Sequence, residues 1–173
     1  MKRYLLAVLL SMFIDIDFVF ADNLNEDDKV VIRDLIIKTL KNQNLVRSSS
    51  RNLNNKDILK NMPKHIIYEN KRYTGKEYLK KLYTKSNSLK TDGIKTIKFS
   101  FKIKKINCLY LNNNSVNCYV KETIKATFVS KDNFLNKVKG EERLNIKFHL
   151  KKNINKKWSI DEQNIVDFEA IAF

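Results

Sequence analysis

Between Gly93 and Asp161 the apolar residues recur at every second position, in four consecutive runs. An alternation with this period is typical of a β-strand that has one buried face and one solvated face. The runs are separated by polar segments near residues 112–114, 130–139 and 153–155, and the first and last of these are rich in Asn, which tolerates the backbone of tight turns. The pattern predicts four strands that follow one another in a curved antiparallel sheet.

The first run changes phase once. Up to Ile103 its apolar residues fall at odd-numbered positions, and from Ile106 they fall at even-numbered positions, so the change lies at Lys104 and Lys105. One extra residue in a strand forms a β-bulge, which bends the strand and increases its twist. We therefore expect a bulge at these two lysines.

The first two runs can be aligned through the turn between them. A turn centred on Asn113 places three apolar pairs opposite one another, namely Ile106 with Val120, Cys108 with Cys118, and Tyr110 with Val116. Agreement of several pairs in one register is expected of an antiparallel hairpin.

Cys108 and Cys118 are the only cysteines of the chain. In an exported protein such a pair is typical of a disulfide. The loop that it would close is short, which limits its stabilisation to about 2–3 kcal/mol. The alternative is two buried free thiols, because directly opposed strand positions strain a disulfide.

The N-terminal segment resembles a secretory signal peptide. Lys2 and Arg3 precede an apolar run from Tyr4 to Ile14, and Ala21 is a small residue at the usual cleavage spacing. The apolar run is too short to span a bilayer comfortably. We predict export to the periplasm or the medium, with residues 1–21 as signal peptide and residues 22–173 as one domain. The alternative is an uncleaved N-terminal anchor.

Helical spacing dominates the first half of the predicted mature chain. One helix is capped by Asn25 and reaches about Lys41, a short one covers residues 55–61, and another is capped by Thr74 and ends near Asn87. Apolar residues on both sides of Asn70 and Lys71 predict a small strand pair. The Asn- and Ser-rich residues 44–55 are predicted to form a loop.

Three short segments carry a family resemblance: residues 57–62 (DILKNM), residues 73–79 (YTGKEYL) and residues 157–160 (KWSI). With the order of the predicted elements, they resemble the nuclear transport factor 2-like superfamily, which includes SnoaL-like and ketosteroid isomerase-like proteins. The resemblance covers nearly all of the predicted mature chain. It implies a cone-shaped α+β fold, in which a strongly bent antiparallel sheet of about four long strands and a small strand pair wraps three N-terminal helices. The superfamily hosts isomerases, dehydratases, transport adaptors and secretion-system assembly subunits, so the fold does not determine an activity.

Glu122 is the candidate for chemistry. It falls on the inward face of the second run, between Val120 and Ile124. A carboxylate in an apolar pocket has a raised pKa and can act as a general base or bind a ligand. The alternatives are an ion pair with a lysine of the predicted bulge, or a second bulge that turns Glu122 to solvent.

The other candidates for a ligand pocket are aromatic: Tyr78, Tyr83, Tyr110 and Trp158. Isomerase-type members of the superfamily use carboxylates together with tyrosines in their pocket. The tyrosines of this chain cannot be matched to that pattern residue by residue. The alternative is that each is a core residue. We expect no cofactor and no metal site, because the only histidines, His65 and His149, are joined by no cysteine or acidic cluster.

The formal net charge is +15, and part of it falls on one predicted surface. The basic residues on the outward face of the sheet are Lys98, Lys102, Lys121, Lys125, Arg143, Lys147 and Lys151. Such a face would attract an anionic surface or an acidic protein. Export and the scarcity of arginine and aromatic residues argue against nucleic acid. The alternative is a solvated face without a partner.

These patterns favour an exported, non-enzymatic domain that binds a partner protein or a small apolar ligand. One alternative is a small-molecule enzyme of the isomerase or dehydratase kind, with Glu122 as its base. Another is an assembly subunit of an envelope secretion system, which a retained N-terminal anchor would favour. Homodimerisation through the sheet is a further interpretation. A filled cone favours the binding domain, and a deep pocket with an ionisable group favours the enzyme.

Overall fold

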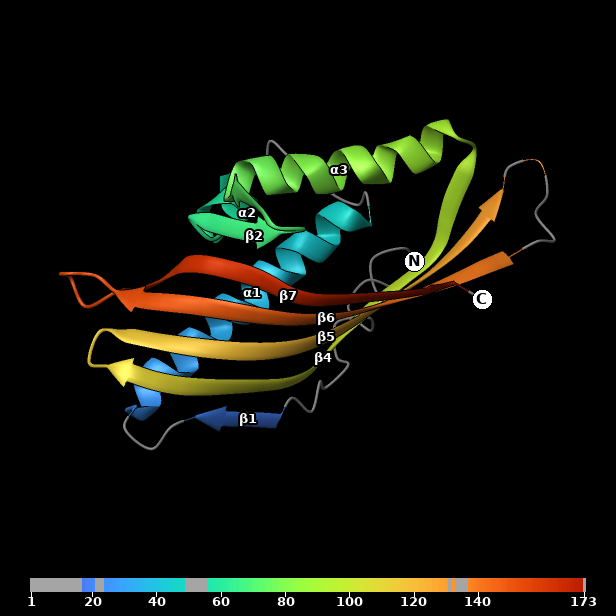
Figure 1. The fold of residues 1–173 in the computed structure, drawn as a ribbon. Helices are drawn as coiled ribbons and strands as arrows, with labels where there is room; N and C mark the ends of the chain where they lie inside the picture. The colour runs from blue at the N-terminus through green and yellow to red at the C-terminus, as the bar shows by residue number, and fades with distance from the viewer. Residues whose placement is uncertain (1–16, 21–23, 49–55, 131, 133–136, 173) are drawn as a thin grey trace, which may run out of the picture.

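A computed structural model of the chain describes residues 17–20, 24–48, 56–130, 132 and 137–172. They form a mixed α+β fold around one seven-stranded sheet, with the strand order β1-β4-β5-β6-β7-β2-β3 (Figure 1). The predicted runs are the four long antiparallel strands β4 (Ile94–Asn112), β5 (Ser115–Ser130), β6 (Lys137–Lys152) and β7 (Trp158–Ala172).

The register of β4 and β5 confirms the predicted hairpin. Ile106 pairs with Val120, Cys108 with Cys118, and Tyr110 with Val116. The predicted bulge is also present, as a register shift between Ile103 and Lys105. The alternation of odd-numbered apolar residues in β4 also predicts that Ile97 points inward. This prediction is wrong, because a further register shift lies between Thr96 and Lys98 and Ile97 is 47% exposed. The extra residue of this bulge interrupts the alternation of inward and outward side chains at Ile97.

Helix α1 (Glu26–Arg47) begins as predicted, with the Asn25 side chain accepting a hydrogen bond from the backbone N–H of Asp28 at 2.7 Å. It continues well past Lys41. The prediction of a loop was therefore wrong for residues 44–47, and residues 49–55 lie outside the described part of the chain. Asn44 and Arg47 continue the buried stripe of Ile36 and Leu40 at helical spacing, but with polar side chains, so the apolar pattern does not show the continuation.

The predicted strand pair and third helix are both present. Strands β2 (His65–Tyr68) and β3 (Lys71–Thr74) form a hairpin whose turn residues, Glu69 and Asn70, have φ values of 51° and 58°. The short helix α2 (Lys56–Lys60) precedes them, and α3 (Gly75–Thr91) follows behind a capping box made by Thr74 and Glu77. A Cβ atom on Gly75 would lie 2.7 Å from Cβ of Met62, so only glycine fits there.

Figure 1 shows α1 crossing one face of the long strands and α3 running on the β7 side. The core lies between these layers. Its fully buried side chains include Ile32, Ile36 and Leu40 of α1 and Ile106 and Phe148 of the sheet. None of the described helices is long and apolar enough to cross a membrane.

Two parts of the sheet were not predicted. Strand β1 (Asp17–Phe20) pairs in parallel with β4 at residues 105–108, although it lies within the predicted signal peptide. Cleavage after Ala21 stays a prediction, as does the anchor alternative, since residues 1–16 lie outside the described ranges. Strand β7 continues to Ala172, and register shifts on both sides of Ile165 hide its alternation in the sequence.

Candidate functional site

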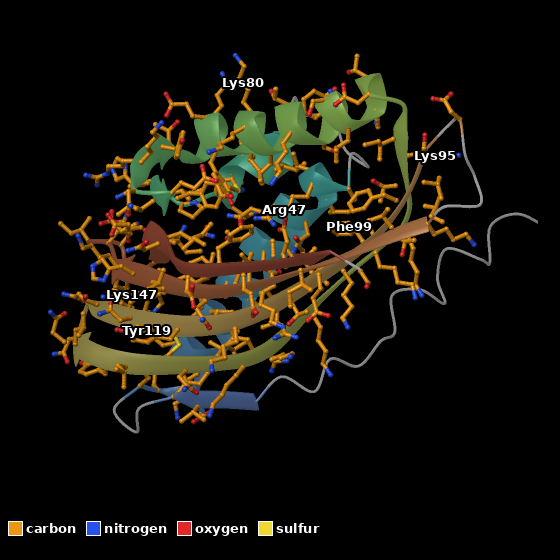
Figure 2. All side chains as sticks on the ribbon, turned by 45° about the vertical axis from the view of Figure 1, so that its right-hand side comes forward. Arg47, Lys80, Lys95, Phe99, Tyr119 and Lys147 are labelled. Atoms are coloured by element: carbon orange, nitrogen blue, oxygen red, sulfur yellow. A yellow bond between two sulfur atoms is a disulfide. The ribbon has the colours of Figure 1, made fainter. Side chains whose placement is uncertain are left out.

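A cavity of about 460 Å³ lies where α1 has ended and the long strands continue. Its sheet wall contains the side chains of Phe99, Ile124, Ala126 and Phe128, and α3 contributes Leu82 and Leu89. Arg47, Tyr68 and Glu142 are also part of the lining and supply polar atoms. The exposed surface of the cavity is therefore mostly apolar, and its charged lining residues include Lys81 and Lys85 of α3 as well as Arg47 at the end of α1. Figure 2 shows Arg47 and Phe99 in the space between α3 and the sheet.

Arg47 connects the cavity to the buried interior. Its Nη1 donates to Oε2 of Glu142 at 2.8 Å, and its Nη2 donates to the Tyr78 hydroxyl at 3.1 Å. Burial opposes the charge of the guanidinium, but Tyr78, Glu142 and Glu122 around it together raise the pKa of Arg47 above its ordinary value. Arg47 is therefore a permanent cation, and only 14% of its side chain is exposed.

Glu122 lies in this buried region, as its place in the alternation of β5 predicts. It is 3% exposed, and its Oε1 accepts a hydrogen bond from Nδ2 of Asn44 at 2.6 Å. Burial raises the pKa of Glu122 to about 7, although Arg47 and the Asn44 hydrogen bond act in the opposite direction. The bulge lysines, Lys104 and Lys105, are exposed, and the hydrogen-bond partner of Glu122 comes from α1 instead.

Arg47, Glu142, Tyr78, Asn44 and Glu122 together form what we call the Arg47 cluster. Two polar atoms of this cluster have no hydrogen-bond partner in the described part of the chain. They are Oδ1 of Asn44 and Nε of Arg47, and both are buried. Buried polar atoms are nearly always hydrogen-bonded in folded proteins. The end of α1 therefore has unused hydrogen-bonding capacity close to the cavity.

The other buried side-chain amide of α1, that of Gln43, is hydrogen-bonded at both its nitrogen and its oxygen to a partner on β7. Gln43 and Gln163 exchange two side-chain hydrogen bonds, of 2.6 and 3.2 Å, between α1 and β7. They are 3% and 0% exposed. This pair fixes the helix against the sheet one turn before the Arg47 cluster.

The described lining of the cavity includes none of the five predicted pocket residues. Tyr78 is fully buried and contacts two residues of the lining, Arg47 by a hydrogen bond and Tyr68 by an edge-to-face ring contact. Glu122 is also buried and interacts electrostatically with Arg47. Tyr83 is partly buried against the core. Tyr110 bonds Asn113 in the turn between β4 and β5, and Trp158 donates to Asp28 at 2.7 Å near the start of α1. The alternation in the sequence predicted which side chains of the sheet point inward. It did not predict at which end of the strands the cavity lies.

Asn44, Arg47 and Glu142 were missed by the sequence reasoning. The available signal was helical spacing that continues from Leu40 through Asn44 to Arg47, which a search for apolar residues alone passes over. Glu142 lies on β6, before the alternation of that strand becomes regular at Leu144.

Cys108 and Cys118 are joined by a disulfide across β4 and β5, as predicted. The disulfide is compatible with an exported protein. Within the described ranges, no group of three or more His, Cys, Asp or Glu side chains is placed to hold a metal ion.

No family model matches the sequence, and no curated protein matches it. Solved structures match in three dimensions. A type 2 hexachlorocyclohexane dehydrochlorinase (LinA) has a TM-score of 0.55 and 11% identity, over 85% of this chain and 93% of that one. The chain therefore shares its α+β fold with this enzyme, in agreement with the fold that the family resemblance implies. The type 3 LinA enzyme of Novosphingobium barchaimii gives the same score at 12% identity, over 85% and 94% of the two chains. At these identities the similarity shows the fold alone.

Proposed function

We propose that this protein binds a small, mostly apolar molecule in the cavity between α3 and the ends of the long strands. The observation that carries the proposal is the cavity itself. Its volume of about 460 Å³ falls within the range of about 300–1,000 Å³ that is usual for ligand pockets. Its walls are largely apolar and carry a smaller number of polar and charged groups, which is the usual composition of such a pocket.

The Arg47 side chain would orient the ligand in the cavity. Arg47 lines the cavity and retains a buried Nε–H without a partner in the described part of the chain. An acceptor atom on the ligand would satisfy this donor, while the rest of the ligand lies against Phe99, Phe128 and Leu89. The preferred ligand is therefore amphiphilic, with one acceptor group on an apolar body.

The proposal includes export. A disulfide persists in an oxidising compartment, and the N-terminal segment has the composition of a signal peptide. The ligand would then be taken from, or delivered to, the periplasm or the medium.

Filling the cavity tests the proposal. Ala126→Phe places an aromatic ring in the cavity, whereas Thr127→Phe adds the same ring on the opposite face of β5 and is the matched control. With anilinonaphthalene sulfonate as a fluorescent amphiphilic probe, we expect Ala126→Phe to weaken binding by roughly tenfold or more, which corresponds to about 1.4 kcal/mol. Thr127→Phe should bind like the wild type. Equal affinities in both variants, or a wild type that binds no probe, would contradict the proposal.

A second candidate function is proton transfer with Glu122 as the base. The observation in its favour is the pKa of Glu122, which at about 7 is suited to a general base at neutral pH. Its weakness is that Glu122 is 3% exposed and lies behind the described lining rather than on it. If a ligand reaches the carboxylate, probe affinity should change with a midpoint near the pKa of Glu122, and Glu122→Gln should abolish that change. A probe affinity that does not change with pH would contradict the proton-transfer function and leave ligand binding as the only proposed function.

The assembly-subunit alternative depends on a retained N-terminal segment. Most of that segment lies outside the described residues, so this alternative receives no support from the fold.

A further inference from the structure

The outward side of β4 and β5 has an unusual distribution of charge. Strand β4 carries five lysines and no carboxylate. The only carboxylate of β5 is Glu122, which points inward and is buried. The lysines of this part of the sheet therefore have no acidic neighbour on either strand.

Four of these lysines, Lys98, Lys102, Lys105 and Lys121, are named here the β4–β5 lysine face. All four are exposed, and none has an ion pair in the part of the chain that the structure describes. Lys105 pairs directly with Lys121 across the two strands. Like charges at directly opposed positions destabilise a sheet. An anionic partner would relieve this repulsion.

The β6–β7 side of the same sheet is different. Strand β7 carries four carboxylates and no basic residue. Arg143 bonds Glu141 at 2.8 Å and Glu169 at 3.3 Å, and Lys151 bonds Asp161 at 2.9 Å. Glu141, Glu169 and Asp161 are thus already engaged within the chain, which argues against self-association of two sheets through these three charges.

Exposed apolar side chains accompany the lysines on β4 and β5. Leu109 is 56% exposed and Tyr119 is 43% exposed. The ammonium of Lys147 lies 5.8 Å from the centre of the Tyr119 ring. Figure 2 shows Tyr119 and Lys147 on the long strands, well away from Lys80, which projects from the outer side of α3.

Lysines interspersed with exposed Leu and Tyr side chains match the chemistry of a bilayer surface, where anionic headgroups lie above an apolar layer. We propose that the β4–β5 lysine face docks the protein on membranes rich in anionic phospholipids. Nucleic acid fits less well, because the face lacks arginine. The docking surface is on the outside of the sheet and does not depend on the cavity.

The test compares two variants of the full chain that lose the same charge. The face variant replaces Lys98, Lys102, Lys105 and Lys121 with Gln. The control variant replaces Lys38, Lys41, Lys76 and Lys80 with Gln, at exposed positions of α1 and α3 that have no ion pair in the described ranges. Both variants should fold, which circular dichroism and thermal unfolding would verify. Removing the Lys105 and Lys121 charges relieves repulsion rather than breaking a contact.

Co-sedimentation with vesicles provides the measurement. We expect the wild type to bind phosphatidylcholine vesicles that contain phosphatidylglycerol and to bind pure phosphatidylcholine far less. Each lysine near an anionic surface strengthens binding by roughly fivefold, so the face variant, which loses four, should bind roughly a thousandfold more weakly, and the control variant within roughly threefold of the wild type. The apolar N-terminal segment is common to all three proteins, so it cannot produce this difference.

Three outcomes would overturn the proposal. Equal losses in the two variants would show that only net charge matters. Equal binding of the wild type to charged and neutral vesicles would show that the lysines are not used. Binding to duplex DNA or polyglutamate that depends on the face, without binding to vesicles, would assign the face to another polyanion.

Discussion

The two ends of the inner sheet surface are built from the same strands but differ in what covers them. At one end, Ile106 and Phe148 are fully buried and belong to the same core cluster as Ile32 and Ile36 of α1. At the other end, Phe99 is only partly buried and faces the cavity. We call these the filled end and the hollow end.

The length of α1 sets the boundary between the two ends. The helix begins beside Trp158 and Lys152, which both donate to the Asp28 carboxylate. It ends beside Glu142, which accepts from Arg47. Strand β6 continues beyond that point to Lys137, and no helical residue of α1 accompanies it.

The sequence of β5 marks the same boundary. Its inward positions are apolar at Val116, Cys118 and Val120, then acidic at Glu122, and then apolar again at Ile124. The one charged inward residue lies where the core gives way to the cavity. On the inward face of β5, the single charge therefore lies at the junction, with apolar residues on both sides of it.

The largest difference between the ends should appear in paired Phe→Ala variants. Phe148→Ala leaves a void in a fully buried site and should lower the free energy of unfolding by about 3–5 kcal/mol. Phe128→Ala enlarges an existing cavity and should lower it by less than about 1.5 kcal/mol, because the lost side chain was only half-buried. Urea unfolding measures both, and similar losses would remove the distinction between a filled and a hollow end.

Arg47→Met tests the junction. It leaves the carboxylates of Glu122 and Glu142 without their cation and should lower the free energy of unfolding by about 3 kcal/mol. Adding Glu122→Gln should recover at least about 1 kcal/mol of that loss, because the two residues interact. Arg72→Met is the control, since Arg72 pairs with Glu162 at 3.6 Å with 62% of its side chain exposed, and should cost under about 1 kcal/mol. Additive losses at residues 47 and 122 would argue against the coupling.

The pH dependence of stability should identify Glu122 as the buried acid. Its folded-state pKa of about 7 exceeds its ordinary value of 4.5, so the folded state binds the extra proton in this interval. Wild-type stability should therefore fall by about 3 kcal/mol, relative to Glu122→Gln, as pH rises from about 4.5 to about 7. Parallel urea titrations of the two proteins measure the difference. Superimposable pH profiles would show that Glu122 titrates like an exposed glutamate.

The smallest effect is expected from the disulfide, which lies at the filled end. Replacing Cys108 and Cys118 together by Ala should cost at most about 2–3 kcal/mol, because the bond closes a short loop. Probe binding at the hollow end should not change. Two thiols that react with an alkylating reagent in denatured, unreduced protein would contradict the bond itself.

The local elements and the pairing between adjacent strands could be predicted from the residues alone. The alternation in β4 and β5, the phase change at Lys104 and Lys105, and the turn at Asn113 predicted the hairpin register and the inward direction of Glu122. The caps at Asn25 and Thr74 predicted the starts of α1 and α3. Each of these features depends on residues close together in the chain, or on two neighbouring strands joined by a short turn.

The end of the core and the surroundings of Glu122 depend on contacts between segments that are far apart in the chain. Asn44 reaches Glu122 across 78 residues of sequence, and Arg47 reaches Glu142 across 95. A polar side chain on the buried stripe of a helix is stable only when a distant segment supplies its partner. The sequence pattern alone therefore predicted a loop at residues 44–47 where the fold has a helix end, a cation and the inner wall of a cavity.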